Sequence, residues 1–352
     1  MYDTIAIGAG LSGLICARRL VRAGLNVLVL EKSRGVGGRM DTRRVETPFG
    51  TATIDRGAQY MTASNDRFRR FVREQIELGT MAEWTRDIYE LKPTGLHPAQ
   101  LDNRYPRYCC PMGMTAIAKN LCESVTVQRE TRIQSLRVTS EGWQAIATDD
   151  RVYRAASVAI AMPAPQILAL LADWLDDSSP LYAPLQSAEY MPCIAAIAGY
   201  DPEVVLPDWQ GVKWVDDERV TWLAIDSSKR IEPPQPTIAI HSTAEFAQEY
   251  WDADEGGLQS AGRYLLERAG DRLEPWLTSP QWMQVHRWRY SLPVETVGLA
   301  SLATRVAAEG SNRRWPLVCA GDWCAGPTVE GAFISGEDAG ARLVAMLQEI
   351  AV

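Results

Sequence analysis

The pattern of apolar and polar residues at the start of the chain predicts a strand, a helix and a second strand. Residues 2–7 form a short apolar run, and residues 14–21 place apolar side chains every three or four positions, with arginines between them. A period near 3.6 is typical of a helix with one buried face. Gly24 suits the left-handed end of that helix, and the apolar run 26–30 predicts the next strand. The chain therefore opens with a βαβ unit.

The same patterns divide the rest of the chain into elements. Amphipathic spacing predicts helices at 66–79, 114–121 and 255–269, and a final helix that opens at residues 330–332. Apolar or alternating runs predict strands at 124–127, 142–146, 157–161, 194–199, 221–225 and 237–241, and a buried strand from 318 that stops at Gly321-Asp322. The Met-Pro-Ala-Pro run 162–165 predicts a domain exit, because proline pushes the residue before it away from the helical conformation.

A glycine-rich turn of the form G-x-G-x-x-G joins the first strand to the first helix. In this pattern the first glycine permits a tight turn, the second lets the backbone approach a pyrophosphate, and the third lets helix and strand pack closely. The free helix N–H groups then face the phosphates, and Glu31 can accept the ribose hydroxyls. A turn without a ligand is the alternative, but strand, helix and acidic residue all lie in register. The candidate binding residues are Gly8, Gly10, Leu11, Ser12, Gly13, Glu31 and Lys32.

A second glycine cluster, Gly37-Gly38-Arg39, indicates FAD as the dinucleotide. An NAD domain normally continues here into a crossover helix, whereas this turn places bare backbone and a guanidinium beside the pyrophosphate, where an arginine can bind with two N–H groups at once. At the far end of the chain, a carboxylate at a strand end can bind the ribityl chain, and a helix N-terminus can stabilise negative charge on the flavin ring. These motifs add Gly38, Arg39, Met40, Gly321, Asp322, Glu330, Gly331 and Ala332 as candidates for FAD.

These motifs together resemble the flavin amine oxidase superfamily. The fingerprint, residues 37–39, residues 55–60 and the closing stretch 329–336 carry the resemblance, which covers essentially the whole chain. Within the superfamily, the stretches 190–193, 226–229 and 286–290, together with His241, resemble the renalase branch. That resemblance implies a flavoprotein that oxidises dihydronicotinamides, including abnormal isomers of NAD(P)H, and passes electrons to oxygen. Residues 229–232 lack the Lys-Pro-Gly turn of the branch, so the exact substrate stays open.

The resemblance also implies the fold, an α/β protein of two domains. The first is a Rossmann-type FAD-binding domain with the p-hydroxybenzoate hydroxylase-like topology, expected over residues 1–63, 104–163 and 290–352. The second is a discontinuous α+β substrate domain on a mixed or antiparallel sheet, expected over residues 64–103 and 164–289. In this fold the strand at 124–127 lies against the adenine, with Val125 or Val127 supplying backbone contacts. A length of 352 residues agrees with two domains at roughly 150 residues each.

Charge and cysteine usage exclude several classes of function. The net charge of −8 gives no electrostatic footprint for nucleic acid or an anionic membrane, and no apolar run reaches the ~18 residues of a membrane span. Seven cysteines without a C-x-x-C pair and only three histidines show no zinc spacing, so we expect no metal. Reduced cysteines predict a cytoplasmic protein. Cys324 is close to Asp322 in sequence, but we expect the FAD to be non-covalent.

Hydride transfer to the flavin requires a planar donor in a dry pocket rather than a side-chain nucleophile. Twelve tryptophans suit a planar ligand, although many of them are expected to fill the core. His241 can bind a carboxamide or carboxylate and, with an ordinary pKa of about 6.5, can change charge near neutrality. A purely structural histidine is the alternative. Arg289 can meet a ligand phosphate or form an ion pair between domains. The pocket candidates are Gln59, Tyr60, Tyr190, Trp222, His241 and Trp288.

Three functions remain open at this point. The first is a dihydronicotinamide oxidase with FAD as cofactor and molecular oxygen as acceptor. The second is an amine oxidase acting on a C–N bond, although the expected pair of tyrosines and flavin-linked lysine is not visible in the sequence. The third is a non-enzymic FAD-binding protein. The first is the interpretation that we favour, with a small-molecule substrate, no nucleic-acid or membrane partner, and an oligomeric state that the sequence leaves open.

Overall fold

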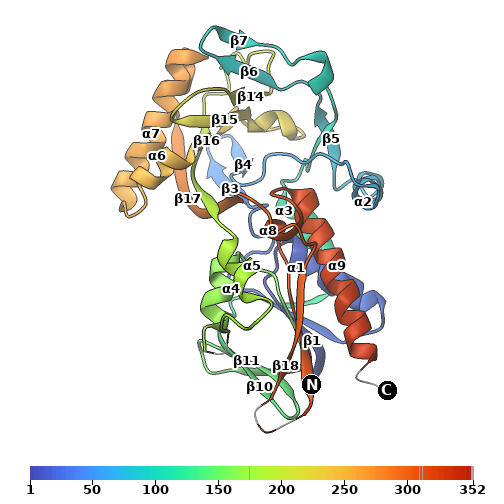
Figure 1. Ribbon diagram of the computed structural model, residues 1–352. Helices are drawn as coiled ribbons and strands as arrows, with labels where there is room; N and C mark the ends of the chain where they lie inside the picture. Colours follow the sequence, from blue (N-terminus) through green and yellow to red (C-terminus); the bar gives the residue numbers. More distant parts are fainter. Residues whose placement is uncertain (174, 309, 311, 350–352) are drawn as a thin grey trace.

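The computed structural model describes residues 1–173, 175–308, 310 and 312–349. These residues form two lobes, each built around its own sheet (Figure 1). Both chain ends lie in the lobe drawn lower in Figure 1, so its sheet is assembled from segments far apart in the sequence. This arrangement confirms the expected fold class, an α/β domain of Rossmann type with a second domain on another sheet.

The first sheet is built outward from β1 (Tyr2–Ile7), which pairs in parallel with β2 (Val27–Leu30) on one side and β12 (Val152–Ile160) on the other. Helix α1 (Leu11–Arg22) connects β1 to β2, as the apolar spacing predicts. The remaining strands of this sheet are β9 (Thr126–Gln128), β10 (Ile133–Thr139), β11 (Gly142–Ala147), β18 (Leu302–Ala307) and β19 (Arg314–Cys319). β9 pairs in parallel with β2, and β19 pairs in parallel with β12. The carboxyl ends of β1, β2, β12 and β19 therefore meet at one edge of the sheet.

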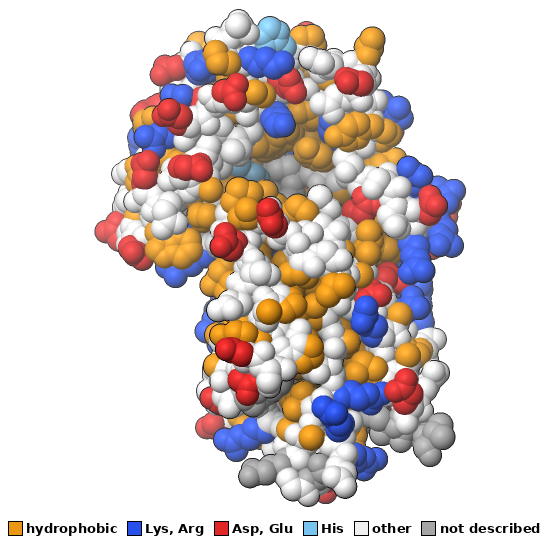
Figure 2. Space-filling view, viewed as in Figure 1, with side chains coloured by type: hydrophobic (Ala, Val, Ile, Leu, Met, Phe, Trp, Pro, Cys, Tyr) orange, Lys and Arg blue, Asp and Glu red, His pale blue; other side chains and the backbone are white. Residues whose placement is uncertain are grey.

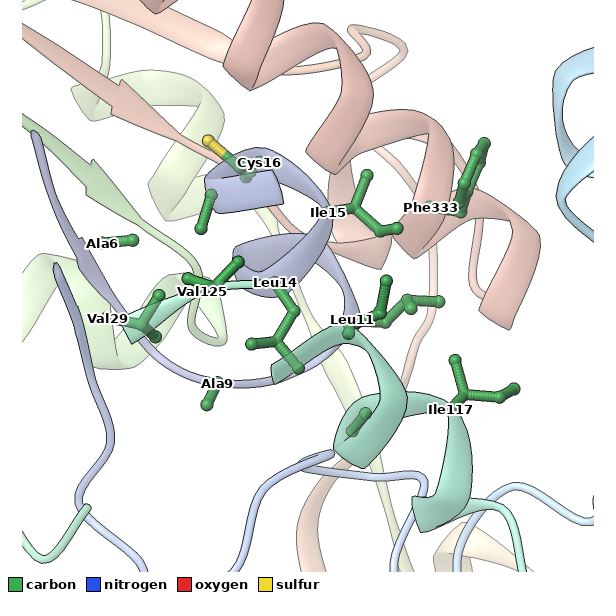
Figure 3. Packing of buried hydrophobic residues seen from close by; sticks show 14 of the residues in the cluster. Ala6, Ala9, Leu11, Leu14, Ile15, Cys16, Val29, Ile117, Val125 and Phe333 are labelled. Atoms are coloured by element: carbon green, nitrogen blue, oxygen red, sulfur yellow. The ribbon is translucent and has the colours of Figure 1, made fainter. Parts of the chain in front are cut away.

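The two ends of the chain pack together through α1 and α9 (Val329–Gln348). Figure 3 shows α1 between the sheet residues Ala6 and Val29 and the last helix, which carries Phe333. A Cβ at Gly336 would lie 2.4 Å from the carbonyl oxygen of Ser12, so only glycine lets the two helix backbones approach this closely. The N-terminal fingerprint and the C-terminal helix therefore share one core.

Several helices cover the first lobe. They are α2 (Asp66–Glu77), α3 (Thr115–Cys122), α4 (Ala164–Leu171), α5 (Tyr182–Ser187) and the short α8 (Asp322–Ala325). α2 begins at Asn65, whose side chain accepts hydrogen bonds from two backbone N–H groups, and it packs Phe68 and Phe71 against Phe333 of α9. None of the helices in the described ranges is long and apolar enough to cross a membrane.

The second sheet runs in the order β17-β13-β16-β15-β14-β6-β7 and is antiparallel except where β14 meets β6. Its strands are β6 (Tyr89–Lys92), β7 (Gly95–His97), β13 (Tyr190–Gly199), β14 (Gly211–Trp214), β15 (Val220–Ile225), β16 (Thr237–Ser242) and β17 (Trp282–Pro293). The helices beside it are α6 (Ala244–Glu249) and α7 (Glu255–Arg272). Side chains alternate along a strand: Ile238 and Ile240 join the core that includes residues of α6 and α7, whereas Ala239 belongs to a separate cluster.

That separate cluster comes from the hairpin of β3 (Thr42–Thr47) and β4 (Gly50–Asp55). Ala52 and Ile54 of β4 pack on Ile197 and Ala239 of the second sheet. Figure 1 shows the hairpin between the two lobes. A second two-stranded sheet joins β5 (Ala82–Thr85) and β8 (Arg107–Cys109), and three short 3-10 helices occupy Leu101–Asn103, Asp226–Lys229 and Pro275–Thr278.

The packing differs from the expected domain boundaries at three places. Helices α2, α4 and α5 fall in segments that we expected in the second domain, but their apolar faces lie in cores of the first lobe. Helix α4 belongs to the first lobe because its Ile167 and Leu171 are buried in one core with Ile5 and Ile160 of the first sheet. β17 runs through the expected boundary at residue 289 without a break. The Met-Pro-Ala-Pro run therefore opens a helix of the first lobe, not a change of domain.

A buried cluster of four charged residues joins the lobes. Arg230 donates from Nη2 to Oδ2 of Asp55 and to Oδ2 of Asp226, both at 2.6 Å, and Lys229 donates to Oδ1 of Asp226 at 2.7 Å. Asp55 also accepts from the backbone N–H of Met114, at the start of α3, at 2.8 Å. All four side chains are at most 4% exposed. Because buried charges are stable only when paired, this cluster fixes the end of β4 against the loop after β15.

We expect Arg230→Met to lower the free energy of unfolding by about 3–5 kcal/mol, because it leaves two buried carboxylates facing a single lysine. Urea unfolding followed by circular dichroism measures the loss. The matched control is Arg86→Met, whose pair with Glu83 is about half exposed and is expected to contribute roughly 0–1 kcal/mol. Equal effects of the two substitutions would show that the buried cluster does not hold the lobes.

Candidate active site

A large cavity of about 1570 Å³ lies between the lobes, at the carboxyl edge of the first sheet. Figure 2 shows the surface hollowed at this level. The lining includes the β1–α1 turn, most of residues 30–43, residues 56–62, the chain after β12, strand β17 and the start of α9. In an open parallel sheet this edge is where ligands bind. The cavity therefore collects segments from both ends of the chain and from both lobes.

The glycines of the first turn have different structural roles. Gly8 has φ +105°, and a Cβ there would lie 2.4 Å from the carbonyl oxygen of Ala161. A Cβ at Gly13 would lie 2.0 Å from the carbonyl oxygen of Gly8. Gly10 is different, since its φ of −74° suits any residue and a Cβ there would meet no protein atom within 4 Å. The protein itself does not require glycine at position 10, and the space it leaves open belongs to the cavity.

The N-terminus of α1 presents free backbone donors to this space. Its cap residue Gly10 makes no side-chain cap and its first turn carries no acidic residue, while Leu11 and Ser12 line the cavity. Such a helix end binds anions through its unpaired N–H groups and dipole. Glu31 follows at the end of β2, where its two oxygens accept from the backbone N–H groups of Ala9 and Ser33, both at 2.8 Å. The turn, the helix end and the oriented carboxylate fit the pyrophosphate and ribose of a dinucleotide.

Arg39 and Asp322, both expected to bind FAD, pair with each other. Nη1 and Nη2 of Arg39 donate to the two carboxylate oxygens of Asp322 at 2.7 and 2.5 Å, and Nη1 also donates to the carbonyl of Ser291 at 3.0 Å. The Asp322 carboxylate is only 7% exposed, so it needs a counter-charge. This differs from the expectation of an arginine fork on the phosphates. Both residues line the cavity, as do Gly38, Gly321 and the buried Met40.

The start of α9 is anchored rather than free. The carboxylate of Glu330 accepts from the backbone N–H groups of Ser64 and Asn65, and the carbonyl of Ala332 accepts from the hydroxyl of Ser12 at 2.7 Å. Gly331 lies against Gly326 and does not line the cavity. Glu330 and Ala332 do line it. The helix N-terminus therefore reaches the cavity, with its acidic side chain bound to the turn before α2.

Strand β9 lies farther from the cavity than the resemblance implied. Val127 pairs with Val29 in the parallel ladder and neither Val125 nor Val127 lines the cavity. The wall beyond Glu31 is formed instead by Thr131, whose N–H donates to the carbonyl of Glu31 at 2.9 Å, and by the three residues after it. The ladder turns the β9 backbone toward β2, so the next loop supplies this wall. Lys32 lines the same end of the cavity.

An aromatic wall closes the second-lobe side. The rings of Tyr60 and Trp222 lie 5.4 Å apart, and Trp222 pairs with His241 across β15 and β16. From β17, Trp288 donates its indole N–H to the carbonyl of Arg56 at 3.1 Å, and the ring of His286 meets it edge-on at 4.3 Å. All five of these ring-bearing residues line the cavity. Tyr190, which we also expected in the pocket, does not line it: its hydroxyl accepts from the N–H of Ala164 and its ring contacts Tyr290.

His241 is not poised to change charge near neutrality, contrary to the sequence-based expectation. Burial, and secondly the charge of Lys229, lower the pKa of His241 to about 4. Its Nε2 is buried without a hydrogen-bond partner. His241 is therefore a neutral imidazole in the wall at physiological pH.

Gln59 is held from behind the wall by Lys229. The Nζ of Lys229 donates to Oε1 of Gln59 at 2.9 Å, and Nε2 of Gln59 donates to the carbonyl of Asp55 at 2.5 Å. The ammonium also lies 5.1 Å from the ring centre of Trp84, which contacts Tyr60 and Trp222. Lys229 itself is fully buried and does not line the cavity. The charge cluster between the lobes therefore extends to the cavity wall through one amide.

Comparison with known proteins identifies the family. Residues 7–75 match the NAD(P)-binding Rossmann-like domain, and residues 99–344, well over half of the chain, match the flavin containing amine oxidoreductases. The chain belongs to this family. Its cofactor is FAD, which the open glycine turn, the free N-terminus of α1 and the carboxylate of Glu31 fit. The protein is therefore a member of a family of flavin-dependent oxidoreductases.

Relatives within the family act on different compounds. The chain is 44% identical over 72 residues to an L-amino acid dehydrogenase of Synechocystis, a match that covers 20% of this chain and 15% of that protein. It is 34% identical over 91 residues to human flavin-containing amine oxidase B, covering 26% of this chain and 17% of that protein. These matches span less than a fifth of either relative. The structure of cyclohexylamine oxidase from Brevibacterium oxydans superposes over 99% of both chains, with a TM-score of 0.72 and 14% identity. The structure of putrescine oxidase bound to putrescine superposes over 98% of this chain and 99% of that one, with a TM-score of 0.69 and 14% identity. Such similarity shows a shared fold.

The burial of some site residues could not be predicted from the sequence. Lys229 lies in the stretch 226–229 that resembles the renalase branch, and Arg230 follows it, but only their tertiary contacts with Asp55, Asp226 and Gln59 show that both side chains are buried. Cys324, which we considered because it is close to Asp322, lies in the core of the first lobe and does not line the cavity. Burial raises the pKa of the Cys324 thiol to about 12, so it stays protonated.

We expect Gly10→Ala and Gly13→Ala to separate FAD binding from folding. A methyl group at position 10 enters the cavity without touching protein, so the apoprotein keeps its stability to within about 0.5 kcal/mol while FAD affinity falls about tenfold, or ~1.4 kcal/mol. A methyl group at position 13 collides with the carbonyl of Gly8 and is expected to lower the free energy of unfolding by about 1–3 kcal/mol. Thermal unfolding of the apoprotein and flavin fluorescence titration measure the two effects. Unchanged FAD affinity in Gly10→Ala would remove this turn from the cofactor site.

We expect His241 to titrate near pH 4, because burial penalises its charged form. Since the folded pKa lies below the unfolded value of about 6.5, the neutral form stabilises the fold above pH 6.5, and that contribution is lost as the pH falls toward 4. Proton NMR of a variant carrying His97→Gln and His286→Gln leaves His241 as the single titrating imidazole. A midpoint near 6.5 would contradict the burial argument.

Proposed function

We propose that this protein is a renalase-like oxidase that removes a hydride from a dihydronicotinamide, either NAD(P)H or one of its ring-reduced isomers. The balanced reaction converts the dihydronicotinamide, one proton and one oxygen molecule into the oxidised nicotinamide and hydrogen peroxide. When bound, FAD supplies the two-electron acceptor that carries the hydride equivalent between the two substrates. The protein residues supply binding, orientation and the exclusion of water.

The observation that carries this proposal is the character of the second-lobe wall, which is aromatic and offers no free carboxylate. Tyr60, Trp222 and Trp288 present flat faces, and His241 is a neutral imidazole. Such a wall suits an uncharged planar ring, which gains from stacking and needs no counter-ion. Within the described lining, each of the four carboxylates is bound by donors of the protein itself.

In this proposal the residues of the wall have separate roles. Tyr60 and Trp222 stack against the dihydronicotinamide, and Trp288, fixed by the carbonyl of Arg56, limits its position from the side of β17. His241 and Gln59 contribute polar edges, and Gln59 is held in one orientation by Lys229. No side-chain nucleophile is required. Tyr190 has no place in this set because it lies outside the cavity.

The cofactor half is assigned in the same way. The N-terminus of α1 would hold the pyrophosphate, Glu31 would hold the ribose of the adenosine half, and the residues after Thr131 would hold the adenine. The Arg39–Asp322 pair and the start of α9, which also line the cavity, would hold the flavin half. A helix N-terminus at that point stabilises negative charge on a reduced ring.

Oxidation of an amine is the second candidate, and two observations favour it. The family and the solved structures that superpose on this chain include oxidases of amines. A buried lysine also lies directly behind the cavity wall, although it reaches the cavity only through Gln59. A neutral amine of modest size fits the same aromatic wall, so the distinction rests on experiment.

We expect anaerobic mixing of the FAD-loaded protein with NADH, NADPH or their ring-reduced isomers to bleach the flavin absorbance, and air to restore it with formation of peroxide. The control panel is a set of primary and secondary amines, including putrescine and cyclohexylamine. Stopped-flow absorbance gives the rate for each donor. Reduction by an amine and by none of the dihydronicotinamides would overturn the proposal in favour of the second candidate.

A further inference from the structure

A buried arginine without a counter-ion lies behind the aromatic wall. Arg107 begins β8 and is only 2% exposed. Its guanidinium carbon lies 5.8 Å from the ring centre of Tyr60 and 4.3 Å from that of Tyr105. Both tyrosines line the cavity, whereas Arg107 does not. The guanidinium is therefore in contact with two rings that a ligand in the cavity would also meet.

The protein holds the side chain of Arg107 in place but does not neutralise its charge. Nη1 donates to the backbone carbonyls of Arg86 and Tyr105 at 2.8 and 3.1 Å, and Nη2 donates to that of Asn103 at 3.2 Å. Nε is buried without a hydrogen-bond partner. Because a guanidinium keeps its proton in a protein, Arg107 is a permanent positive charge that only dipoles compensate.

The acidic groups near Arg107 supply no counter-charge. Glu83 and Asp87, in the segment beside β8, are each paired with another arginine, and the ion pairs of the described residues include none for Arg107. Burial raises the pKa of Tyr60, and although the charge of Arg107 opposes that rise, Tyr60 remains a neutral phenol at physiological pH. The tyrosine is therefore not a phenolate partner for the guanidinium.

The other cations close to the wall are paired or exposed. Lys229 is paired with Asp226, and Arg56 is paired with Asp41. Arg43 lines the cavity but is exposed to water, which weakens its field. Arg107 differs from these cations because it is both buried and unpaired.

Two arginines of β17 also line the cavity but do not face the aromatic wall. Side chains alternate along a strand, so Arg287 and Arg289 lie on the face of β17 opposite to Trp288. Nη1 of Arg287 donates to the carbonyl of Tyr250, between α6 and α7, at 2.7 Å, and the guanidinium of Arg289 lies 5.0 Å from the ring centre of Trp251. The ion pair between domains that was one alternative for Arg289 is not among those of the described residues.

We propose that Arg107 is a specificity-determining residue, which excludes positively charged ligands from the aromatic wall and admits neutral ones. The face of an aromatic ring attracts a cation. At Tyr60 and Tyr105 a guanidinium already makes this interaction, so a second cation on the cavity side meets its repulsion in a site where little water screens it. A neutral planar ring stacks on Tyr60 without that penalty.

The consequence for the proposed reaction is a difference between substrate and product. A dihydronicotinamide ring is neutral, whereas the ring that has lost a hydride carries a positive charge. The field of Arg107 therefore weakens binding of the product, and it opposes the charge that develops on the ring as the hydride leaves. A protonated amine is excluded for the same reason. This consequence rests on the proposed function, whereas the exclusion of cations does not.

The first test uses two probes of the same shape and different charge. They are 1-methylnicotinamide, a fixed cation, and 3-methylbenzamide, in which carbon replaces the charged ring nitrogen. Calorimetry with the FAD-loaded protein gives both affinities. We expect the parent to bind the neutral probe about tenfold more tightly or better, and Arg107→Gln to reduce this preference by about fivefold or more. A purely structural arginine would change both affinities by the same factor.

Two further variants serve as controls. Arg107→Lys keeps the charge and is expected to keep the preference for the neutral probe, even if both affinities fall. Arg73→Gln, on the exposed face of α2, removes the same charge from the surface and is expected to bind both probes as the parent does. Circular dichroism and FAD content check the fold of each variant. If Arg107→Gln does not fold, Arg107→Lys decides, because a loss of the preference with the charge retained overturns the proposal.

The second test follows flavin reduction by 1-methyl-1,4-dihydronicotinamide, with 1-methylnicotinamide as the inhibiting product. We expect Arg107→Gln to lower the inhibition constant of the product by about fivefold or more, with a limiting rate constant for reduction at least as large as that of the parent. Equal affinity of the parent for the two probes, or an unchanged preference in Arg107→Gln, would overturn the role of Arg107. If the probes are discriminated as expected but no dihydronicotinamide reduces the flavin, that role stands and the proposed oxidase fails.

Discussion

The buried cluster of Asp55, Asp226, Lys229 and Arg230 is the interaction on which the arrangement of the molecule depends. Neither carboxylate would remain charged in that interior without a cation, and neither cation without a carboxylate, so the two lobes are stable only in the relative position that brings all four together. Asp55 ends β4 and also binds the N–H that begins α3, whereas Asp226 begins the 3-10 helix after β15. The cluster therefore sets the distance across which the cavity opens.

The same cluster determines the local geometry of the cavity wall. Residues 56–60 follow Asp55 directly, so fixing that carboxylate fixes the start of the segment that carries Gln59 and Tyr60. Lys229 adds a hydrogen bond to Gln59 and a positive charge that, after burial, holds the pKa of His241 low. A wall that must present neutral polar edges to a ligand is in this way kept neutral by charges placed one layer behind it.

The cofactor half was largely predictable from sequence because its chemistry is carried by the backbone. A tight turn, a close helix contact and an exposed helix end each demand glycine or a fixed spacing, and Gly8, Gly13 and Glu31 occupy the expected places. Side-chain pairing was not predictable. The mutual pairing of Arg39 and Asp322, residues 283 positions apart, and the burial of Arg230 depend on tertiary contacts that no local pattern records. Helix α4 was expected in the second lobe but packs in the first. A proline-rich run looks the same in the sequence whether the helix after it packs on the sheet before it or on the next one.

This division between backbone and side chains bears on how one fold serves different substrates. The cofactor site is formed by the glycine turn, the helix N-terminus and the strand ends of the first sheet, and its carboxylates are bound by donors of the protein itself. The substrate side is formed by an edge strand and a hairpin, whose exposed positions are free to change without disturbing either core. Substitutions at those positions can therefore alter which substrate such a fold accepts while both cores stay intact.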